Sequence, residues 1–330
     1  MFLIKRRMYI MKKKLAALAL SSLMLFSVVG CSKVEQKSEE ELQEQQTKYT
    51  AYANDEHIVS AIDAKAMIDA GGNIALIDIS DPVDYVLGHA EGFANAWRPD
   101  YSAAEGTYEY GGMSNTKEEM AALLGRLGAD KDSTILIMGT KDNHDPYRFF
   151  WQLKMFGNDN AKVVDGGIDA WKAAGLPTQM TSPSVTAKTF EFTGPERPEL
   201  LADMATVLAA IDDDKYVIVD TRSLDEATGA TTLKGAFRPG RIPNSVWIEF
   251  KENLNEDKTF KTAEELRALY EAQGVTSDKI IIPYCQSGVR SAQTTFVLSE
   301  LLGYENVMNY DGSWIEWSFN EDMPVEMGDL

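Results

Sequence analysis

The strongest restriction on the fold of this chain is an internal duplication. An apolar run at 133–139 recurs at 279–285, 146 residues later, and Trp171 recurs as Trp317 at the same spacing. Each run leads through a short polar loop into a helical pattern. Because several anchors share one register, the sequence indicates a repeated structural unit and predicts two similar domains.

The repeat also divides the chain into segments. We expect a lipoprotein-type signal at 1–30, a polar tether at 31–56, a first domain at 57–180, a linker at 181–196 and a second domain at 197–330. Within each half, β-type runs alternate with helical patterns, which predicts an α/β fold with a parallel sheet flanked by helices. In such sheets the ligand crevice lies at the carboxyl ends of the strands, where Cys285 falls.

The first thirty residues have the pattern of a secretory signal. A basic start is followed by an apolar run at 15–29, which is too short to favour a membrane-spanning helix. Residues 28–31, Val-Val-Gly-Cys, resemble the lipobox of bacterial lipoproteins, and the resemblance implies lipidation of Cys31. We therefore expect an extracytoplasmic protein whose membrane contact is a lipid anchor in a bacterial cell membrane or outer membrane. A cleaved soluble protein with an incidental Cys31 is the alternative.

Charge and composition exclude several other classes. The chain carries 32 basic and 51 acidic residues, a net charge of −19. The six basic residues of 1–30 are accompanied by no acid, so the remainder carries −25. A surface this acidic repels phosphate backbones, and we expect no nucleic-acid partner. Two cysteines and three histidines without ligand spacing predict neither a disulfide framework nor a metal site.

The loop that starts at Cys285 carries the chemistry. It follows a buried apolar run and precedes a helix expected to begin near 291, so its N–H groups and the helix N-terminus should favour an anion. Gly288 permits the unusual backbone angles of such a cradle, and Arg290 should lower the pKa of the thiol. A buried structural cysteine is the alternative. We predict a nucleophilic Cys285.

Four motifs together resemble the rhodanese family of sulfurtransferases. They are Cys285-x-x-Gly288-x-Arg290, Asp220-Thr-Arg222, Gly240-Arg-Ile-Pro243 and the stretch 310–317. The resemblance covers both halves and implies two tandem rhodanese-like domains, as in the thiosulfate and 3-mercaptopyruvate sulfurtransferases. It further implies that a persulfide forms on Cys285 and that only the second domain is catalytic. The repeat agrees, since it sets Gly139 opposite Cys285 and His144 opposite Arg290.

The resemblance also assigns roles to individual residues. Around the catalytic Cys285, the loop and substrate residues are Gln286, Ser287, Gly288, Val289, Arg290 and Arg222. Asp220 and Arg241 are supporting residues, and Asp220 is expected to order loops by hydrogen bonds. Relatives commonly carry another arginine after the position of Arg222, for which Lys234, Arg238 or Arg241 could substitute here. Trp314 and Trp317 are expected in the core.

The implied reaction moves a sulfane sulfur from thiosulfate or 3-mercaptopyruvate to cyanide or a thiol, with no cofactor. The loop has the form associated with neither donor, so the donor stays open. A tethered binding or redox-partner lipoprotein is a second interpretation. A cysteine phosphatase is a third, although four residues separate Cys285 from Arg290 where phosphatases have five, and Tyr284 replaces their usual histidine.

Overall fold

The computed structural model describes residues 47–140 and 144–330. The expected signal segment, the lipobox with Cys31 and most of the expected tether lie outside these residues. Within the two described ranges, no helix combines the length and the hydropathy that crossing a membrane requires.

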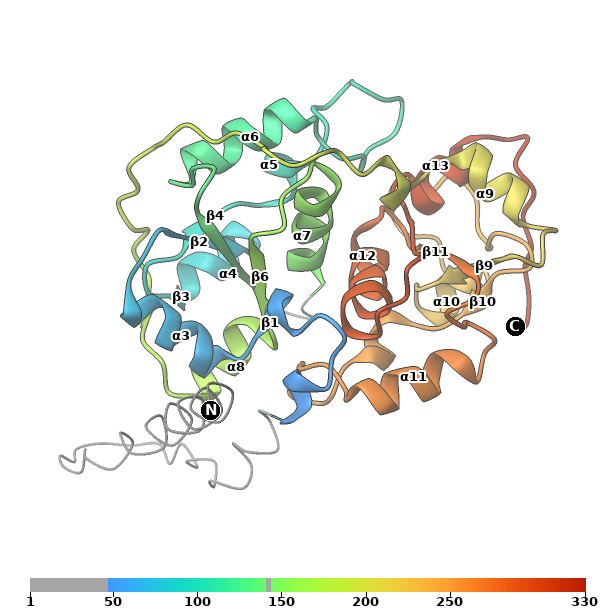
Figure 1. Cartoon of the computed structure of the whole chain (residues 1–330). Helices are drawn as coiled ribbons and strands as arrows, with labels where there is room; N and C mark the ends of the chain where they lie inside the picture. The colour runs from blue at the N-terminus through green and yellow to red at the C-terminus, as the bar shows by residue number, and fades with distance from the viewer. Residues whose placement is uncertain (1–46, 141–143) are drawn as a thin grey trace, which may run out of the picture. The chain divides into compact units, whose positions relative to one another are not determined.

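A five-stranded parallel sheet forms the centre of the first half (Figure 1). Its order is β1 (Ile58–Val59), β6 (Ala161–Val164), β5 (Thr134–Gly139), β2 (Ile74–Ile79) and β4 (Ala94–Asn95). Side chains of β5 alternate between two apolar clusters, because successive residues of a strand face opposite sides. Ile135 and Ile137 face one cluster, and Leu136 and Met138 face the other.

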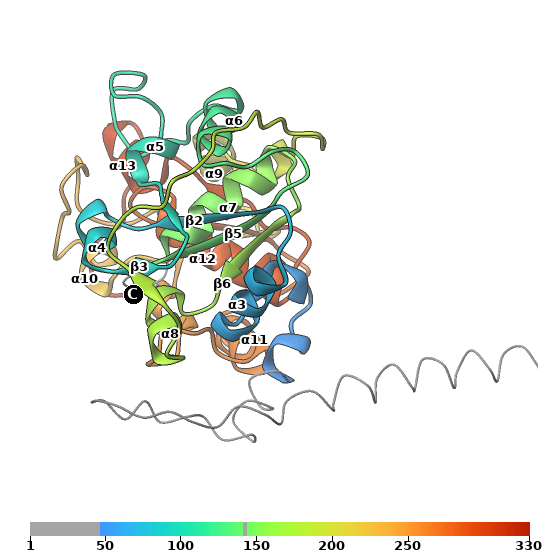
Figure 2. The same ribbon diagram turned by 90° about the vertical axis from the view of Figure 1, so that its left-hand side faces the viewer.

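Helices cover both faces of this sheet, as Figure 2 shows. One face packs against α3 (Ala61–Ala70) and α8 (Gly167–Ala173), and the other against α6 (Lys117–Arg126) and α7 (Asp145–Met155). Shorter elements complete the half: α4 (Pro82–Leu87), α5 (Arg98–Tyr101), and β3 (His89–Ala90) paired with β7 (Thr178–Gln179).

The second half repeats this order of strands. Strand β11 (Ile280–Tyr284) pairs with β9 (Tyr216–Asp220), which pairs with β10 (Val246–Trp247). On the other side, a parallel bridge from Ile281 to Val307 leads to β12 (Asn309–Tyr310), which pairs with β8 (Leu201–Ala202). The main helices are α9 (Met204–Ala210), α10 (Leu224–Ala227), α11 (Ala263–Glu271), α12 (Val289–Phe296) and α13 (Ser313–Phe319). The expected fold class, with two tandem α/β domains, is confirmed.

Capping residues and a glycine mark several of the helix starts. Thr116 and Thr262 form capping boxes at α6 and α11. The expected start of a helix near 291 is wrong, because α12 begins at Val289. Gly288 takes a left-handed conformation, with φ 73°, and lets the chain turn from the loop straight into the helix.

Helices α7 and α12 pack against each other and join the two halves (Figure 1). One apolar cluster contains residues from both halves. At its centre, the Phe296 ring of α12 lies 4.8 Å from the Tyr147 ring and 5.0 Å from the Phe150 ring of α7. Large buried aromatic side chains dominate the energetics of such contacts, so each half depends on the other to cover its apolar surface.

The end of the expected tether is packed rather than free. Tyr49 and Tyr52 are buried, although the surrounding composition is polar. The Tyr49 hydroxyl donates to Asp165 of the first half at 3.0 Å, and the Tyr52 hydroxyl donates to the carbonyl of Lys261 in the second half at 2.8 Å. Two aromatic side chains therefore fix this segment to both halves.

Candidate functional site

Cys285 directly follows β11, at the carboxyl edge of the second sheet. Its thiol is free, and the residue is only 1% exposed. The preceding Tyr284 is paired in register with Asp220 at the end of β9. The structure thus brings the expected nucleophile and the expected supporting acid to adjacent strand ends.

The hydroxyl of Ser313 organises the loop. It accepts hydrogen bonds from the backbone N–H groups of Cys285 and Gly288, at 3.1 and 3.0 Å, and donates to the carbonyl of Tyr310 at 2.7 Å. Two N–H groups of α13 also hold the loop: that of Trp314 donates to the carbonyl of Cys285, and that of Ile315 donates to the carbonyl of Gln286. Sequence reasoning noticed the stretch 310–317 but missed this role of Ser313.

The surroundings of the thiol favour its ionised form. Burial opposes ionisation of Cys285, but the charge of Arg290 and hydrogen bonds from the backbone N–H groups of Ser291 and Ser287 outweigh it, and the pKa of the thiol is lowered. The Ser291 hydroxyl lies 3.6 Å from the sulfur. A thiolate is the nucleophilic form of cysteine, so these surroundings suit a nucleophilic Cys285.

Arg290 is held by an acid that sequence reasoning did not identify. Its Nη1 and Nη2 donate to the two carboxylate oxygens of Glu226 at 2.7 and 2.8 Å. Glu226 is itself fixed in the capping box that Ser223 forms at the start of α10. The available signal was that capping box, but nothing in the local pattern connects it with an arginine 64 residues away.

Asp220 and Arg222 form a buried pair beneath the loop. The Arg222 Nε lies 2.9 Å from Asp220 Oδ1, and Asp220 also accepts from the Tyr284 hydroxyl at 2.7 Å. The Arg222 guanidinium stacks over the ring of Trp314 at 4.6 Å. Asp220 therefore lies where a loop-ordering residue is expected. Arg222, which was predicted to contact substrate, is instead buried against Asp220 and Trp314.

Two of the three cations considered for donor binding, Arg238 and Arg241, are also bonded to protein groups. Arg241 is buried, pairs with Glu326 and donates to the carbonyl of Gly328 at 2.8 Å, which attaches the C-terminal segment. Arg238 donates to five carbonyls at the end of α13 and beyond. Lys234 is exposed. Arg238 and Arg241 therefore have structural partners that account for their positions.

The first half reaches the loop directly. Arg148 of α7 is buried, donates to the carbonyl of Gly288 at 3.3 Å and pairs with Asp311. Gly112 lies so close to Ser287 that an added Cβ would come within 2.7 Å of the serine Cβ. Neither contact was predicted, because the two residues of each pair lie more than 130 positions apart in the sequence.

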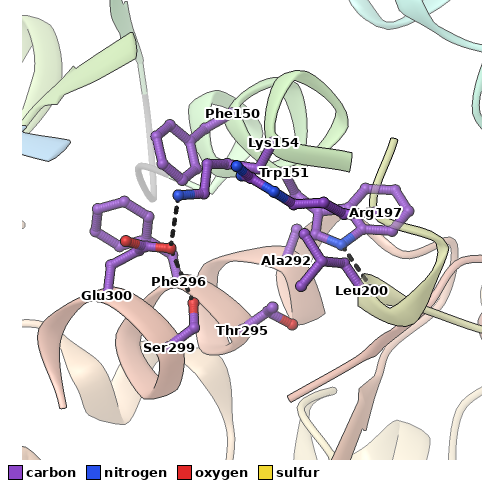
Figure 3. Close-up of a pocket in the computed structure, with 10 residues that line it drawn as sticks. All are labelled: Phe150, Trp151, Lys154, Arg197, Leu200, Ala292, Thr295, Phe296, Ser299 and Glu300. Atoms are coloured by element: carbon purple, nitrogen blue, oxygen red, sulfur yellow. Dashed lines mark hydrogen bonds and ion pairs between the residues drawn. The ribbon is translucent and has the colours of Figure 1, made fainter. Parts of the chain in front are cut away.

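A separate pocket of about 190 Å³ lies between α7 and α12 (Figure 3). Aromatic side chains of both halves line it, together with Lys154, Arg197 and Glu300. Figure 3 shows Lys154 extended toward Glu300, and the two charged groups lie 3.7 Å apart. No residue of the 285–290 loop lines this pocket. In the described parts of the chain, no cluster of His, Cys, Asp and Glu side chains is suited to a metal ion.

Comparison with known proteins shows that both halves match the same protein family. A model described as the rhodanese-like domain matches the chain twice, at residues 60–174 and 203–320. The chain is 38% identical over 224 residues to the sulfur carrier protein TtuD of Thermus thermophilus, covering 65% of this chain and 78% of that protein. It is 39% identical over 218 residues to the "putative thiosulfate sulfurtransferase" of Haloferax volcanii, covering 64% and 76%. A Mycobacterium bovis relative with the same description, SseA, is 31% identical over 287 residues, covering 85% and 94%.

Solved structures show the same fold. The anaerobic ergothioneine biosynthesis enzyme from Chlorobium limicola, in complex with trimethyl histidine, has a TM-score of 0.74 and 21% identity, covering 84% of this chain and 72% of that chain. A variant of EanB with a cysteine persulfide and ergothioneine has a TM-score of 0.76 and 22% identity, with the same coverage. At these identities the likeness establishes the fold alone.

Proposed function

The chain belongs to the rhodanese family, and on that premise we propose that it is a sulfurtransferase. It moves a sulfane sulfur from thiosulfate or 3-mercaptopyruvate to cyanide or a thiol through a persulfide on Cys285. The observation that carries this proposal is a buried thiol with a lowered pKa, which the charge of Arg290 and the backbone N–H groups of Ser287 and Ser291 stabilise in its ionised form. Two relatives named as thiosulfate sulfurtransferases support thiosulfate as the donor, and the relative named as a sulfur carrier protein supports a sulfur-carrying role.

In the first step the Cys285 thiolate attacks the outer sulfur of thiosulfate. A new S–S bond forms, the S–S bond of thiosulfate breaks, and sulfite leaves with that electron pair. With 3-mercaptopyruvate a C–S bond breaks instead, and the enolate of pyruvate leaves and takes a proton from water. The loop N–H groups and Arg290 stabilise the anionic persulfide that remains.

In the second step the acceptor attacks the outer sulfur of the persulfide. With cyanide, the S–S bond of the persulfide breaks, thiocyanate leaves, and the Cys285 thiolate is restored. This is a two-step covalent scheme that needs no external oxidant or reductant. We propose that it proceeds without a metal or organic cofactor.

Steady-state kinetics test the scheme. Thiosulfate and cyanide are varied together, and thiocyanate formation is measured. A covalent enzyme intermediate gives parallel double-reciprocal lines, and Cys285→Ser abolishes turnover because its hydroxyl cannot hold a sulfane sulfur. Intersecting lines, or turnover that survives Cys285→Ser, would favour the tethered binding lipoprotein instead.

The phosphatase interpretation is disfavoured by the length of the loop, because four residues separate Cys285 from Arg290 where phosphatases have five.

We also propose that the mature protein is extracytoplasmic and lipid-anchored through Cys31. The proposal rests on the sequence of the first 31 residues. Cell fractionation of a Cys31→Ala variant tests it: full-length precursor should accumulate, or soluble material should be released. Processing and membrane retention like those of the wild type would contradict the anchor.

A further inference from the structure

Four arginines lie near the Cys285 loop, and each pairs with an acid. The pairs are Arg98 with Asp145, Arg148 with Asp311, Arg222 with Asp220, and Arg290 with Glu226. Their exposure differs sharply. The side chains of the last three arginines are 2%, 1% and 15% exposed, whereas that of Arg98 is 40% exposed. Arg98, which belongs to the first half, is therefore the one of these four most accessible from solvent.

The guanidinium of Arg98 is oriented but not saturated. Its Nε donates to Asp145 Oδ1 at 2.6 Å and its Nη2 to Asp145 Oδ2 at 3.0 Å. Nη2 also lies 3.2 Å from Nε2 of His144. Nη1 has no hydrogen-bond partner within the ranges that the structure describes. Asp145 thus fixes the edge of the guanidinium formed by Nε and Nη2, while the NH₂ group of Nη1 remains available to an anionic oxygen.

Contacts of α7 place this group at the boundary with the second half. The ring of His144, which precedes the helix, packs edge-on against the ring of Phe250 at 5.1 Å. One turn into the helix, Arg148 donates to the carbonyl of Gly288 in the catalytic loop. The start of α7, where Asp145 holds Arg98, therefore faces the same loop.

Electrostatics agree with this placement. Burial lowers the pKa of Arg98, but Asp145 more than compensates, and the charge of the Cys285 thiolate is among the further influences that raise it. The main influences on the pKa of the thiol itself are burial, the charge of Arg290 and hydrogen bonds with Ser291 and Ser287. Arg98 is thus suited to contact a molecule beside the sulfur rather than to ionise the sulfur itself.

We propose that Arg98 binds the anionic oxygen atoms of the sulfur donor while Cys285 attacks it, so that the first half supplies a substrate contact. The inference rests on the proposed function and deepens it, because it assigns the donor to small sulfur compounds with a sulfonate-like or carboxylate group. The chain beyond residue 30 carries −25, and an accessible cation beside the thiol offsets this repulsion locally.

Kinetics of Arg98 variants test the contact. Arg98→Gln should raise the KM for thiosulfate about tenfold or more, the loss expected for one charge-assisted hydrogen bond. The KM for cyanide should change by no more than about threefold, because cyanide meets the enzyme after the donor anion has left. Arg98→Lys should recover part of the donor affinity, since it keeps the charge but not the fork.

A second measurement does not depend on sulfur transfer. Sulfite, the leaving group of thiosulfate, should slow alkylation of Cys285 by iodoacetamide. The sulfite concentration that halves the alkylation rate should rise about tenfold in Arg98→Gln. The control is Arg126→Gln, because Arg126 is an exposed arginine of the same half that pairs with Asp100. It should match the wild type in both measurements.

The outcomes separate the two proposals. If no donor transfers sulfur but Arg98→Gln loses protection by sulfite, the sulfurtransferase proposal fails and the anion contact stands. If transfer is normal and folded Arg98→Gln matches the wild type in donor KM and in sulfite protection, the contact is wrong. Failure of sulfite to protect the wild-type thiol would also overturn it.

Discussion

At Cys285, burial and the charge of Arg290 act on the thiol in opposite directions. The sequence indicated both residues, because the spacing from Cys285 to Arg290 is local. Glu226, which orients Arg290, could not be predicted, since its partner comes from another helix. The net effect is a lowered pKa, which means that more of the thiol is ionised near neutral pH than in an ordinary cysteine.

Removing the charge of Arg290 should reverse that effect. Because Arg290→Ala alone leaves a buried carboxylate unpaired, the double variant Glu226→Gln/Arg290→Ala is the cleaner test. We expect the midpoint of a pH titration of iodoacetamide alkylation to rise relative to the wild type. Glu226→Gln alone keeps the arginine and should shift the midpoint less. An unchanged midpoint in the double variant would show that the loop N–H groups determine the thiol pKa alone.

Asp78 occupies the place of Asp220 in the first half, but Ser80 stands where Arg222 would be. Burial raises the pKa of Asp78 to about 7, despite the hydrogen bond from Ser80. Within the described chain its Oδ2 has no hydrogen-bond partner. Because the folded pKa lies above the unfolded value of about 3.9, the protonated carboxyl favours the folded state. That contribution is complete below about pH 4 and is lost as the pH rises through 7.

Asp78→Asn should remove this pH dependence. We expect the melting temperature of the wild type to fall relative to that of the variant between about pH 4 and pH 7.5. Thermal denaturation at several pH values measures the difference. Parallel curves for the two proteins would show that Asp78 ionises normally in the folded state.

Among the elements, the start of α13 supports the Cys285 loop. Ser313 has a positive φ of 50° and accepts two loop N–H groups. The strands and helices around it could be anticipated from apolar runs, helical patterns and the repeat. The helix start at Val289 could not, because it depends on the left-handed turn at Gly288 and on contacts with residues 310–315.

Ser313→Ala should weaken the loop. Two buried N–H groups lose their acceptor, which costs about 1–3 kcal/mol of the free energy of unfolding for each group left unsatisfied and displaces the cradle. Both the melting temperature and the rate of persulfide formation should fall. Ser318→Ala is the matched control: this buried serine of α13 accepts from the N–H of Phe237, away from the loop. It should lower stability without a comparable loss of rate.

On the scale of the whole molecule, the two halves share one of their apolar clusters. The duplication predicted the two domains. The absence of a thiol opposite Cys285 predicts that the second domain is the one that reacts. The interface was less accessible to sequence reasoning, because its contacts join distant residues such as Arg148 and Gly288. The packing of Tyr49 and Tyr52 was likewise hidden in a polar segment.

A fragment of residues 197–330 should therefore be unstable alone. Removing the first half exposes the apolar side of α12, including Phe296, whose ring packs against Tyr147 and Phe150 of α7. We expect aggregation in size-exclusion chromatography and loss of activity, whereas the intact chain stays soluble and active. A soluble, fully active fragment would contradict the dependence of the second half on the first.

The most direct test of the central claim is the mass of the intact protein after incubation with thiosulfate and removal of excess donor. Formation of a persulfide on Cys285 predicts a gain of one sulfur atom in the wild type and none in Cys285→Ser. Cyanide should then return the wild type to its original mass and release thiocyanate. A wild-type mass unchanged by thiosulfate and by 3-mercaptopyruvate, or the same gain in Cys285→Ser, would contradict the account.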